Sequence, residues 1–273
     1  MDIDISAVPD SVVEDAASLQ NYLVPLYVVG NAPVPDVRPI GSGTLVEIGG
    51  DHYILTAAHV WDASRDATDL GLSLTTTWSR FLVPRNLIVP KELWQRNPEE
   101  WGPDLTLLRL PPSHVPRIEA HKSFLNLPKQ RAALATRPPN TQKGYWAVTG
   151  MVGQFTTVKR DHEARAVQIQ MASRAFFTCI TDGHDRDGYD YLDVGAKLDL
   201  PGTPSTFGGV SGGGLWEIGL VMKSGTISWD GKRYFRGVAF WESPLTDGRR
   251  RVIRCHGPRS IFEVAWQSWQ LPQ

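Results

Sequence analysis

Apolar and polar residues alternate in short runs along most of the chain, and Gly, Pro, Asp and Asn residues separate the runs. An alternation with a period of two is typical of β-strands with one buried face, and many such runs between turn residues favour a barrel or a sandwich. The predicted strands include residues 22–29, 43–48, 52–56, 105–110, 145–149, 175–180, 214–218, 237–241 and 251–256.

Helical signals are confined to the two ends of the chain. Residues 11–20 predict one short helix behind Ser and Asp caps, and residues 261–269 predict another, for which Ser260 and Glu263 form a capping-box pair. The proline-rich residues 128–140 lack alternation, so they predict a linker between two β halves.

Composition narrows the class of protein. A chain of 273 residues is long enough for a large core and for one or two domains. Its 41% hydrophobic and 21% charged residues are typical of a soluble globular protein and exclude disordered and fibrous classes. Because 28 Lys and Arg nearly balance 29 Asp and Glu, the formal net charge is -1, and no nucleic acid partner is indicated.

The N-terminal residues MDIDISAVPDSVVEDAASLQ are acidic and lack an unbroken apolar stretch, so they do not resemble a secretory signal. No later segment approaches the ~20 apolar residues that a membrane span requires. We therefore expect a cytoplasmic protein without a membrane partner. The two cysteines, Cys179 and Cys255, have no metal-ligand spacing, and the missing export signal argues against a disulfide without excluding one.

Three segments carry candidate chemistry. The first, GSGTLVEIGGDHYILTAAHV, starts at Gly41 and contains His59 near its end; the second, GPDLTLLRL, places Asp104 directly before an apolar strand; the third, GGVSGGG, surrounds Ser211. Together they resemble the histidine, aspartate and nucleophile motifs of trypsin-like serine peptidases of the chymotrypsin superfamily, in the same His, Asp, Ser order. The resemblance extends over nearly the whole chain.

The resemblance implies a fold. We expect an all-β protein made of two antiparallel six-stranded β-barrels packed face to face, with a short C-terminal helix and the three motif residues in the cleft between the barrels. Residues 1–20 would form an extension or short helix, residues 21–140 the barrel that carries His59 and Asp104, and residues 141–273 the barrel that carries Ser211.

The three residue types fit one reaction. A serine hydroxyl becomes a good nucleophile only when a neighbouring base accepts its proton, which is the role expected for His59. A buried carboxylate, here Asp104, fixes the tautomer of the imidazole and stabilises its protonated form. In the superfamily, backbone N–H groups that correspond to those of Gly209 and Ser211 form the oxyanion hole. We expect no metal and no cofactor.

Each of these residues also has a structural interpretation. His59 alone fits a satisfied core histidine, Asp104 a turn cap after Gly102, and Ser211 a structural Gly-Ser turn. The co-occurrence of the three motifs favours the catalytic interpretation.

Two other segments attract attention but do not favour a site. Residues 182–193 are rich in acidic groups, yet Gly183 and Val194 fall on the terminal ligand positions of a calcium loop, so a surface turn is expected. An arginine cluster comprising Arg249, Arg250, Arg251, Arg254 and Arg259 fits a solvated hairpin edge.

Departures from the superfamily pattern concern activation and specificity. The residue before the nucleophile, commonly an aspartate that pairs with a freed N-terminus, is Val210, so activation by that cleavage is not expected. Ser205 falls at the base of the specificity pocket, with Glu242 on its rim and His256 on a wall. Since Ser205 has no charge, we expect poor cleavage after Lys or Arg; His256 or Arg254 favours an acidic side chain, and an apolar preference stays open.

The sequence thus predicts a serine endopeptidase from an intracellular, prokaryotic-type branch, which acts on proteins or peptides and is open to a regulatory protein partner. Two other functions remain alternatives. One is a catalytically inactive protease fold used as a binding or adaptor module, and the other is a serine esterase.

Overall fold

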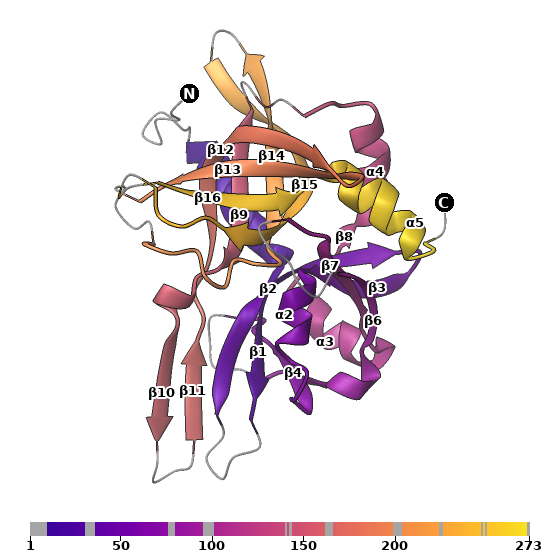
Figure 1. The fold of residues 1–273 in the computed structure, drawn as a ribbon, viewed down its shortest axis with the longest axis vertical. Coiled ribbons are helices and arrows are strands. Elements are labelled where there is room, and N and C mark those ends of the chain that lie inside the picture. The colour runs from indigo at the N-terminus through magenta and orange to yellow at the C-terminus, as the bar shows by residue number, and fades with distance from the viewer. Residues whose placement is uncertain are drawn as a thin grey trace.

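The computed structural model describes residues 10–30, 36–75, 80–94, 101–139, 141, 144–161, 166–198, 204–223, 226–246, 248 and 250–271. Strands dominate it and form two β units, one above the other in Figure 1. The acidic residues 1–9, His162 and Arg249 lie outside the described residues.

The N-terminal unit is an eight-stranded sheet. Seven strands follow the antiparallel order β5-β4-β1-β2-β3-β7-β6, and β8 pairs in parallel with β2. The strands are β1 (Leu23–Val29), β2 (Val37–Ile48), β3 (Asp51–Thr56), β4 (Asp69–Leu72), β5 (Leu82–Pro84), β6 (Val89–Trp94), β7 (Asp104–Arg109) and β8 (Leu125–Asn126). The six strands and the closure expected for this half are wrong for the described residues, because β5 and β6 are the ends of the order and do not pair with each other.

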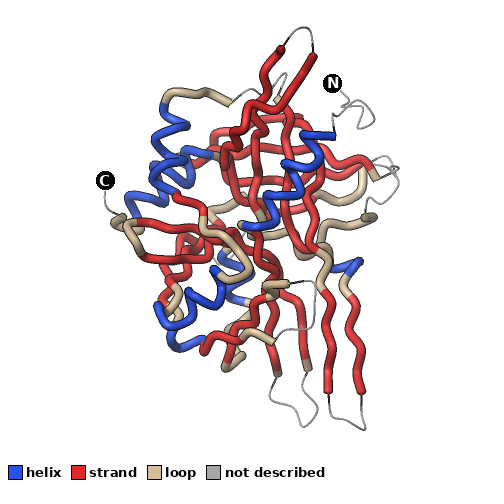
Figure 2. Tube along the Cα trace, turned by 180° about the vertical axis from the view of Figure 1, so that it is seen from behind, coloured by secondary structure: helices blue, strands red, loops and turns tan. Residues whose placement is uncertain are grey.

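The C-terminal unit is a closed antiparallel barrel of six strands, as expected, with the order β12-β13-β16-β15-β14-β9. Its strands are β9 (Tyr145–Met151), β12 (Ser173–Arg186), β13 (Tyr189–Lys197), β14 (Gly214–Lys223), β15 (Thr226–Glu242) and β16 (Arg250–His256). A separate hairpin of β10 (Thr157–Asp161) and β11 (Ala166–Gln170) extends from this barrel beside β1 and β2 (Figures 1 and 2).

Short helices connect and cover the two units. They are α1 (Asp10–Ser18), α2 (Ala58–Asp62), α3 (Val115–Glu119), α4 (Leu127–Ala135), and a π-helix (Ser260–Ala265) that continues into α5 (Trp266–Ser268). Single 3-10 turns lie at Leu19–Asn21, Arg85–Leu87, Pro112–His114 and Gly153–Phe155. No helix in the described ranges is long and apolar enough to cross a membrane.

Helix α4 lies in the proline-rich segment between β8 of the N-terminal sheet and β9 of the barrel, so the expectation that helices are confined to the two ends of the chain is wrong here. The Asn126 side chain accepts a hydrogen bond from Lys129 N at 2.9 Å and caps the helix. Pro128 is tolerated because it lies in the first turn, and the following KQRAALA residues are mostly strong helix formers.

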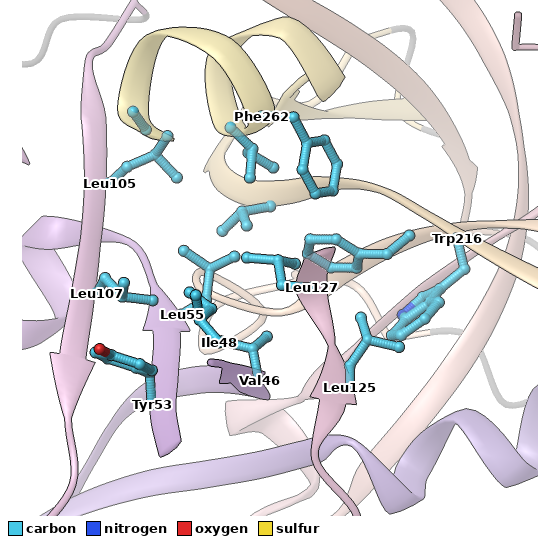
Figure 3. Packing of buried hydrophobic residues seen from close by; sticks show 14 of the residues in the cluster. Val46, Ile48, Tyr53, Leu55, Leu105, Leu107, Leu125, Leu127, Trp216 and Phe262 are labelled. Carbon is cyan, nitrogen blue, oxygen red and sulfur yellow. The ribbon is translucent and has the colours of Figure 1, made fainter. Parts of the chain in front are cut away.

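One hydrophobic core joins the two units. Leu55 and Leu105 of the N-terminal sheet pack in the same cluster as Trp216 of the barrel and Phe262 of the π-helix (Figure 3). Because interiors are close-packed, this shared core fixes the position of β3 and β7 relative to the barrel. His59, three residues after β3, and Asp104, the first residue of β7, are therefore held in place against the second unit.

Candidate active site

His59 and Asp104 form a hydrogen-bonded pair. Strand β3 ends at Thr56, Ala57 is extended, and the short helix α2 then carries His59. His59 Nδ1 lies 2.5 Å from Asp104 Oδ2, and the His59 backbone N–H donates to Asp104 Oδ1 at 2.9 Å. The Asp104 side chain is 2% exposed and that of His59 is 38% exposed. An ionised carboxylate only accepts, so Nδ1 carries the proton and Nε2 is left as a base.

A second histidine supports Asp104 from behind. The Asp104 backbone N–H donates to His256 Nε2 at 3.1 Å. His256 is fully buried and stacks on Phe240, with 4.4 Å between ring centroids. Burial lowers the pKa of His256 to about 3, against a smaller opposing effect of Asp104, so the ring is neutral at pH 7. We expected His256 on the wall of the specificity pocket; it lies in the interior and has no exposed surface for a substrate.

Ser211 lies on the loop that enters β14, close to the segment that carries His59. Its backbone oxygen accepts from Ser42 N at 2.8 Å, and its Oγ donates to Phe240 O at 3.4 Å. A Cβ added to Gly41 would lie 2.6 Å from a methyl of Val60 and 3.0 Å from Ser211 O, so both segments border the same glycine. His59 and Ser211, both described, share no hydrogen bond in this structure.

Three carbonyl groups of the loop before β14, next to Ser211, are hydrogen-bonded. Val210 O accepts from Gly213 N at 2.7 Å, which fixes the peptide that contains the Ser211 N–H. Gly208 O accepts from Gly153 N at 2.7 Å, which fixes the peptide that contains the Gly209 N–H. Gly209 O accepts from the Ser42 hydroxyl at 2.7 Å.

The N–H groups of the same loop divide into two sets. Val210 N donates to Phe207 O at 2.9 Å, and Gly212 N donates to Ala239 O at 2.7 Å. The N–H groups of Gly209 and Ser211 donate to none of the described residues. These two donors are the ones that the motif resemblance assigns to an oxyanion hole. Gly209 has φ +96°, a conformation that glycine adopts without strain.

Val210 is part of the barrel core. It is 1% exposed and belongs to the cluster that includes Trp146 and Leu215. A Cβ added to Gly150 would lie 2.9 Å from Val210, so the loop packs directly on β9. Apolar packing thus holds the position where a carboxylate is common in the superfamily.

The residues expected to set specificity are paired with the protein itself. Glu242, at the end of β15, accepts from Thr206 Oγ1 at 3.0 Å and from Phe207 N at 2.9 Å, and its Oε1 lies 3.2 Å from Arg251 Nε. Ser205 is exposed, and both its N–H and its hydroxyl donate to Gln154 Oε1. From the sequence, Arg251 was expected in a solvated cluster and at the start of one pocket wall, residues 251–256; its pairing with Glu242 was not expected.

Arg254, the other candidate for binding an acidic side chain, also has internal partners. Its Nε and Nη2 donate to the two carboxylate oxygens of Asp193 at 2.7 and 2.8 Å, and its guanidinium lies 3.7 Å from the ring centroid of Trp101. A bidentate pair of this kind leaves little capacity for a substrate carboxylate.

No cluster of ligating side chains fit for a metal ion occurs among the described residues. The acidic stretch forms the β12–β13 hairpin, with Asp187 and Gly188 at positive φ in its turn. A surface turn was expected there. Cys179 and Cys255 are free thiols.

Comparison with known proteins supports the fold. No family model and no curated protein matches the sequence. Among 160 matching chains of solved structures is one described as "HtrA-type protease AlgW with decapeptide", with 12% sequence identity and a TM-score of 0.51. The match covers 95% of this chain and 68% of that chain. At that identity the likeness concerns the fold alone, and the fold is that of the chymotrypsin-like proteases.

Proposed function

We propose that this protein is a serine endopeptidase that hydrolyses peptide bonds through Ser211, His59 and Asp104. The observation that carries the proposal is the His59–Asp104 pair: a buried carboxylate accepts from both the ring Nδ1 and the backbone N–H of one histidine. That arrangement selects the tautomer in which Nε2 is free to accept a proton. It occurs in a protease fold, next to the loop that carries Ser211.

The chemistry uses only protein groups and water. A rotation about the Ser211 Cα–Cβ bond moves Oγ from the Phe240 carbonyl toward His59. His59 Nε2 takes the hydroxyl proton as Oγ attacks the substrate carbonyl, and the carbonyl oxygen becomes an oxyanion. His59 then gives that proton to the leaving amine, and an acyl-enzyme forms. Water, deprotonated by His59, releases the acid and restores Ser211.

The oxyanion is assigned to the Gly209 and Ser211 N–H groups. Preorganised donors at this position are commonly the largest contribution to catalysis, and losing one costs ~3–4 kcal/mol of barrier. The surrounding carbonyls already have partners, so a flip of the loop would break several hydrogen bonds. This favours a hole that does not depend on a freed N-terminus.

The substrate class in this proposal is a protein or peptide. The matched HtrA-type structure is described with a decapeptide, which supports a peptide-binding role for this fold. A cytoplasmic location and a regulatory protein partner remain part of the proposal, on the sequence arguments alone.

An inactive adaptor is the second candidate, because Ser211 Oγ donates to Phe240 O and not to His59. A fluorophosphonate probe with intact-mass detection separates the two. An enzyme gains one label, lost in Ser211→Ala and strongly slowed in His59→Ala; an adaptor gains none. The double variant should be no slower in peptide hydrolysis than the worse single variant, since the triad acts as a unit.

The esterase alternative is tested with the same preparations. If Ser211-dependent turnover occurs with small esters but with no protein or peptide in a broad peptide library, the endopeptidase proposal is wrong.

A further inference from the structure

Ser42 connects the N-terminal sheet to the loop of residues 204–213 before β14, the nucleophile loop, which contains Ser211. It lies on β2, fully buried, between Gly41 and Gly43. Its hydroxyl donates to Gly209 O at 2.7 Å and accepts from Met151 N at 2.8 Å. Both partners belong to the other β unit, so one hydroxyl bridges the two units at the candidate oxyanion hole.

The backbone of Ser42 makes the same connection. Its N–H donates to Ser211 O at 2.8 Å, and its carbonyl accepts from Thr56 Oγ1 at 2.6 Å. Ser42 therefore holds the carbonyls of Gly209 and Ser211, on either side of Val210. Thr56 in turn holds Ser42, three residues before His59.

The loop fits tightly around this contact. A Cβ added to Gly212 would lie 2.0 Å from Ser42 O and 2.1 Å from Thr56 Oγ1. Gly209, in contrast, has φ +96° and no side chain to limit rotation of its peptides. The peptide between Gly209 and Val210 is held at its carbonyl by the Ser42 hydroxyl and at its N–H by Phe207 O, at 2.9 Å. It lies between the two peptides that carry the Gly209 and Ser211 N–H groups, so its orientation affects both of them.

We infer that Ser42 is a positioning residue that sets the geometry of the oxyanion hole from the opposite β unit. The inference rests on the proposed peptidase function and adds a residue that touches neither substrate nor the reacting atoms. It also explains why the N-terminal sheet has a buried polar side chain at this position. The hydroxyl donates to one residue of the barrel unit and accepts from another, so it is satisfied there.

The test is Ser42→Ala, which removes the hydroxyl and keeps the backbone bonds. We expect kcat per titrated active site to fall about 10- to 100-fold, because small displacements of preorganised donors have effects of that order. KM should change little, and the acid limb of the pH profile should keep its midpoint because the His59–Asp104 pair is untouched. Ser42→Thr, which retains the hydroxyl, should recover most of kcat.

Ser64→Ala is the matched control. Ser64 is equally buried, donates to Trp61 O at 2.6 Å and accepts from Arg85 Nε at 3.1 Å, and it contacts none of the groups assigned to the reaction. It should lower the melting temperature without lowering kcat per titrated site. Thr56→Val, which loosens Ser42 without changing it, is a second variant should Ser42→Ala fail to fold, and it should lower kcat in the same direction.

The outcomes are distinguishable. If the unaltered protein gains no label at Ser211, the proposed function is wrong and the role of Ser42 with it. If the unaltered protein is active and Ser42→Ala, or Thr56→Val in its place, keeps kcat within twofold, or loses no more than Ser64→Ala, only the role of Ser42 is wrong.

Discussion

At the residue scale, Asp104 is held through both its side chain and its main chain. The carboxylate accepts two hydrogen bonds from His59, and the backbone N–H donates to His256. A buried carboxylate is costly unless its charge is compensated, and the two hydrogen bonds from His59 compensate it. The same bonds orient the imidazole, so stability and tautomer selection depend on one contact.

Asp104→Asn should separate these two effects. The amide has the same shape but offers only one acceptor, so it favours the His59 tautomer with the proton on Nε2. We expect turnover to fall by on the order of 10⁴, while the melting temperature changes modestly. Steady-state kinetics on the folded variant check this, and a loss of less than tenfold would contradict the assigned role of Asp104.

His256 should make the fold sensitive to acid. The pKa of His256 is lowered from 6.5 to about 3 by burial, so below pH 6.5 the unfolded chain binds a proton that the folded protein does not. The contribution of neutral His256 to the free energy of unfolding is therefore fully present above pH 6.5. It is lost as pH falls toward 3, by about 1.4 kcal/mol per pH unit. The neighbouring Tyr191, whose pKa burial raises to about 12, stays neutral throughout.

Urea unfolding at pH 7, 5.5 and 4.5 measures this effect against His256→Gln, which retains an acceptor but does not titrate. The free energy of unfolding should fall more steeply in the unaltered protein than in the variant. Parallel curves for the two proteins would mean that His256 does not carry the pH dependence.

At the element scale, strands β15 and β16 place Glu242 next to Arg251. Their ion pair is about one-fifth exposed on each side, and Glu242 also accepts from the loop before β14. A substrate Lys or Arg would have to compete with this arginine for the carboxylate. The charge arrangement supports the expectation of poor cleavage after basic residues.

Arg251→Gln should therefore raise cleavage after Lys and Arg relative to apolar residues. Exposed ion pairs contribute up to ~1 kcal/mol, which corresponds to about a fivefold change in the ratio. A peptide library gives the ratio, and Arg250→Gln on the same strand changes the net charge equally without touching Glu242. Equal shifts in both variants would point to long-range charge, and dominant Lys or Arg cleavage in the unaltered protein would overturn the expectation.

Sequence patterns predicted the middle of each expected strand better than the residues at which some strands begin. β3 and β7 follow clear apolar runs and were predicted within one residue at each end. β2 begins at Val37, six residues before the predicted start, because Pro39 and Gly41 read as breakers although they lie at an irregular register opposite Leu26 and Tyr27. Proline and glycine are tolerated at such bulges.

The start of β15 was missed for a similar reason. Its Asp230-Gly231 pair is a turn signal, and the predicted strand started only at Gly237. In the structure the register shifts between Ile218 and Leu220, opposite residues 229–233, so the extra residues form a bulge inside one long strand. Pairing partners far apart in sequence decide between a turn and a bulge, and alternation alone does not contain that information.

Some residues of the candidate site were predicted from the sequence, and others were not. His59 and Asp104 were found by motif, and the structure places them in contact. His256 was assigned to a pocket wall from the resemblance to the superfamily, but its ring lies in the interior and accepts from the backbone N–H of Asp104. Ser42 had a visible signal, a serine between two glycines, although only the contact between units gives it a role.

At the scale of the whole molecule, a buried ion pair fastens the connection between the two units to the barrel. Arg236 and Glu217, each 1% exposed, are paired at 2.6 Å, and Arg236 also donates to the backbone oxygen of Arg137. Burial lowers the pKa of Arg236 while Glu217 opposes that effect. With the shared core, this contact keeps the units in one arrangement, which a site built from both of them requires.

Helix α1 belongs to that shared core. Val12 and Ala16 of α1 are buried in the same cluster as Trp216, as is Leu19 of the 3-10 turn that follows. Ser18 Oγ accepts from Arg233 Nη1 at 2.7 Å. Figure 2 shows α1 lying across the barrel strands. The segment before β1 therefore contributes to stability through packing, and its described residues share no hydrogen bond with the nucleophile loop.

This arrangement predicts activity without N-terminal cleavage. A freed ammonium entering the loop would need a carboxylate partner, and buried Val210 provides none, so an unpaired buried charge would be very costly. The uncut chain of 273 residues should gain one fluorophosphonate label at Ser211. A chain that lacks residues 1–18 should label at the same serine, but its unfolding free energy should fall by about 2–4 kcal/mol from lost apolar burial and its melting temperature by roughly 5–15 °C. Intact-mass analysis and thermal unfolding measure both quantities, and label that appears only after cleavage near the N-terminus would show that a new terminus is needed after all.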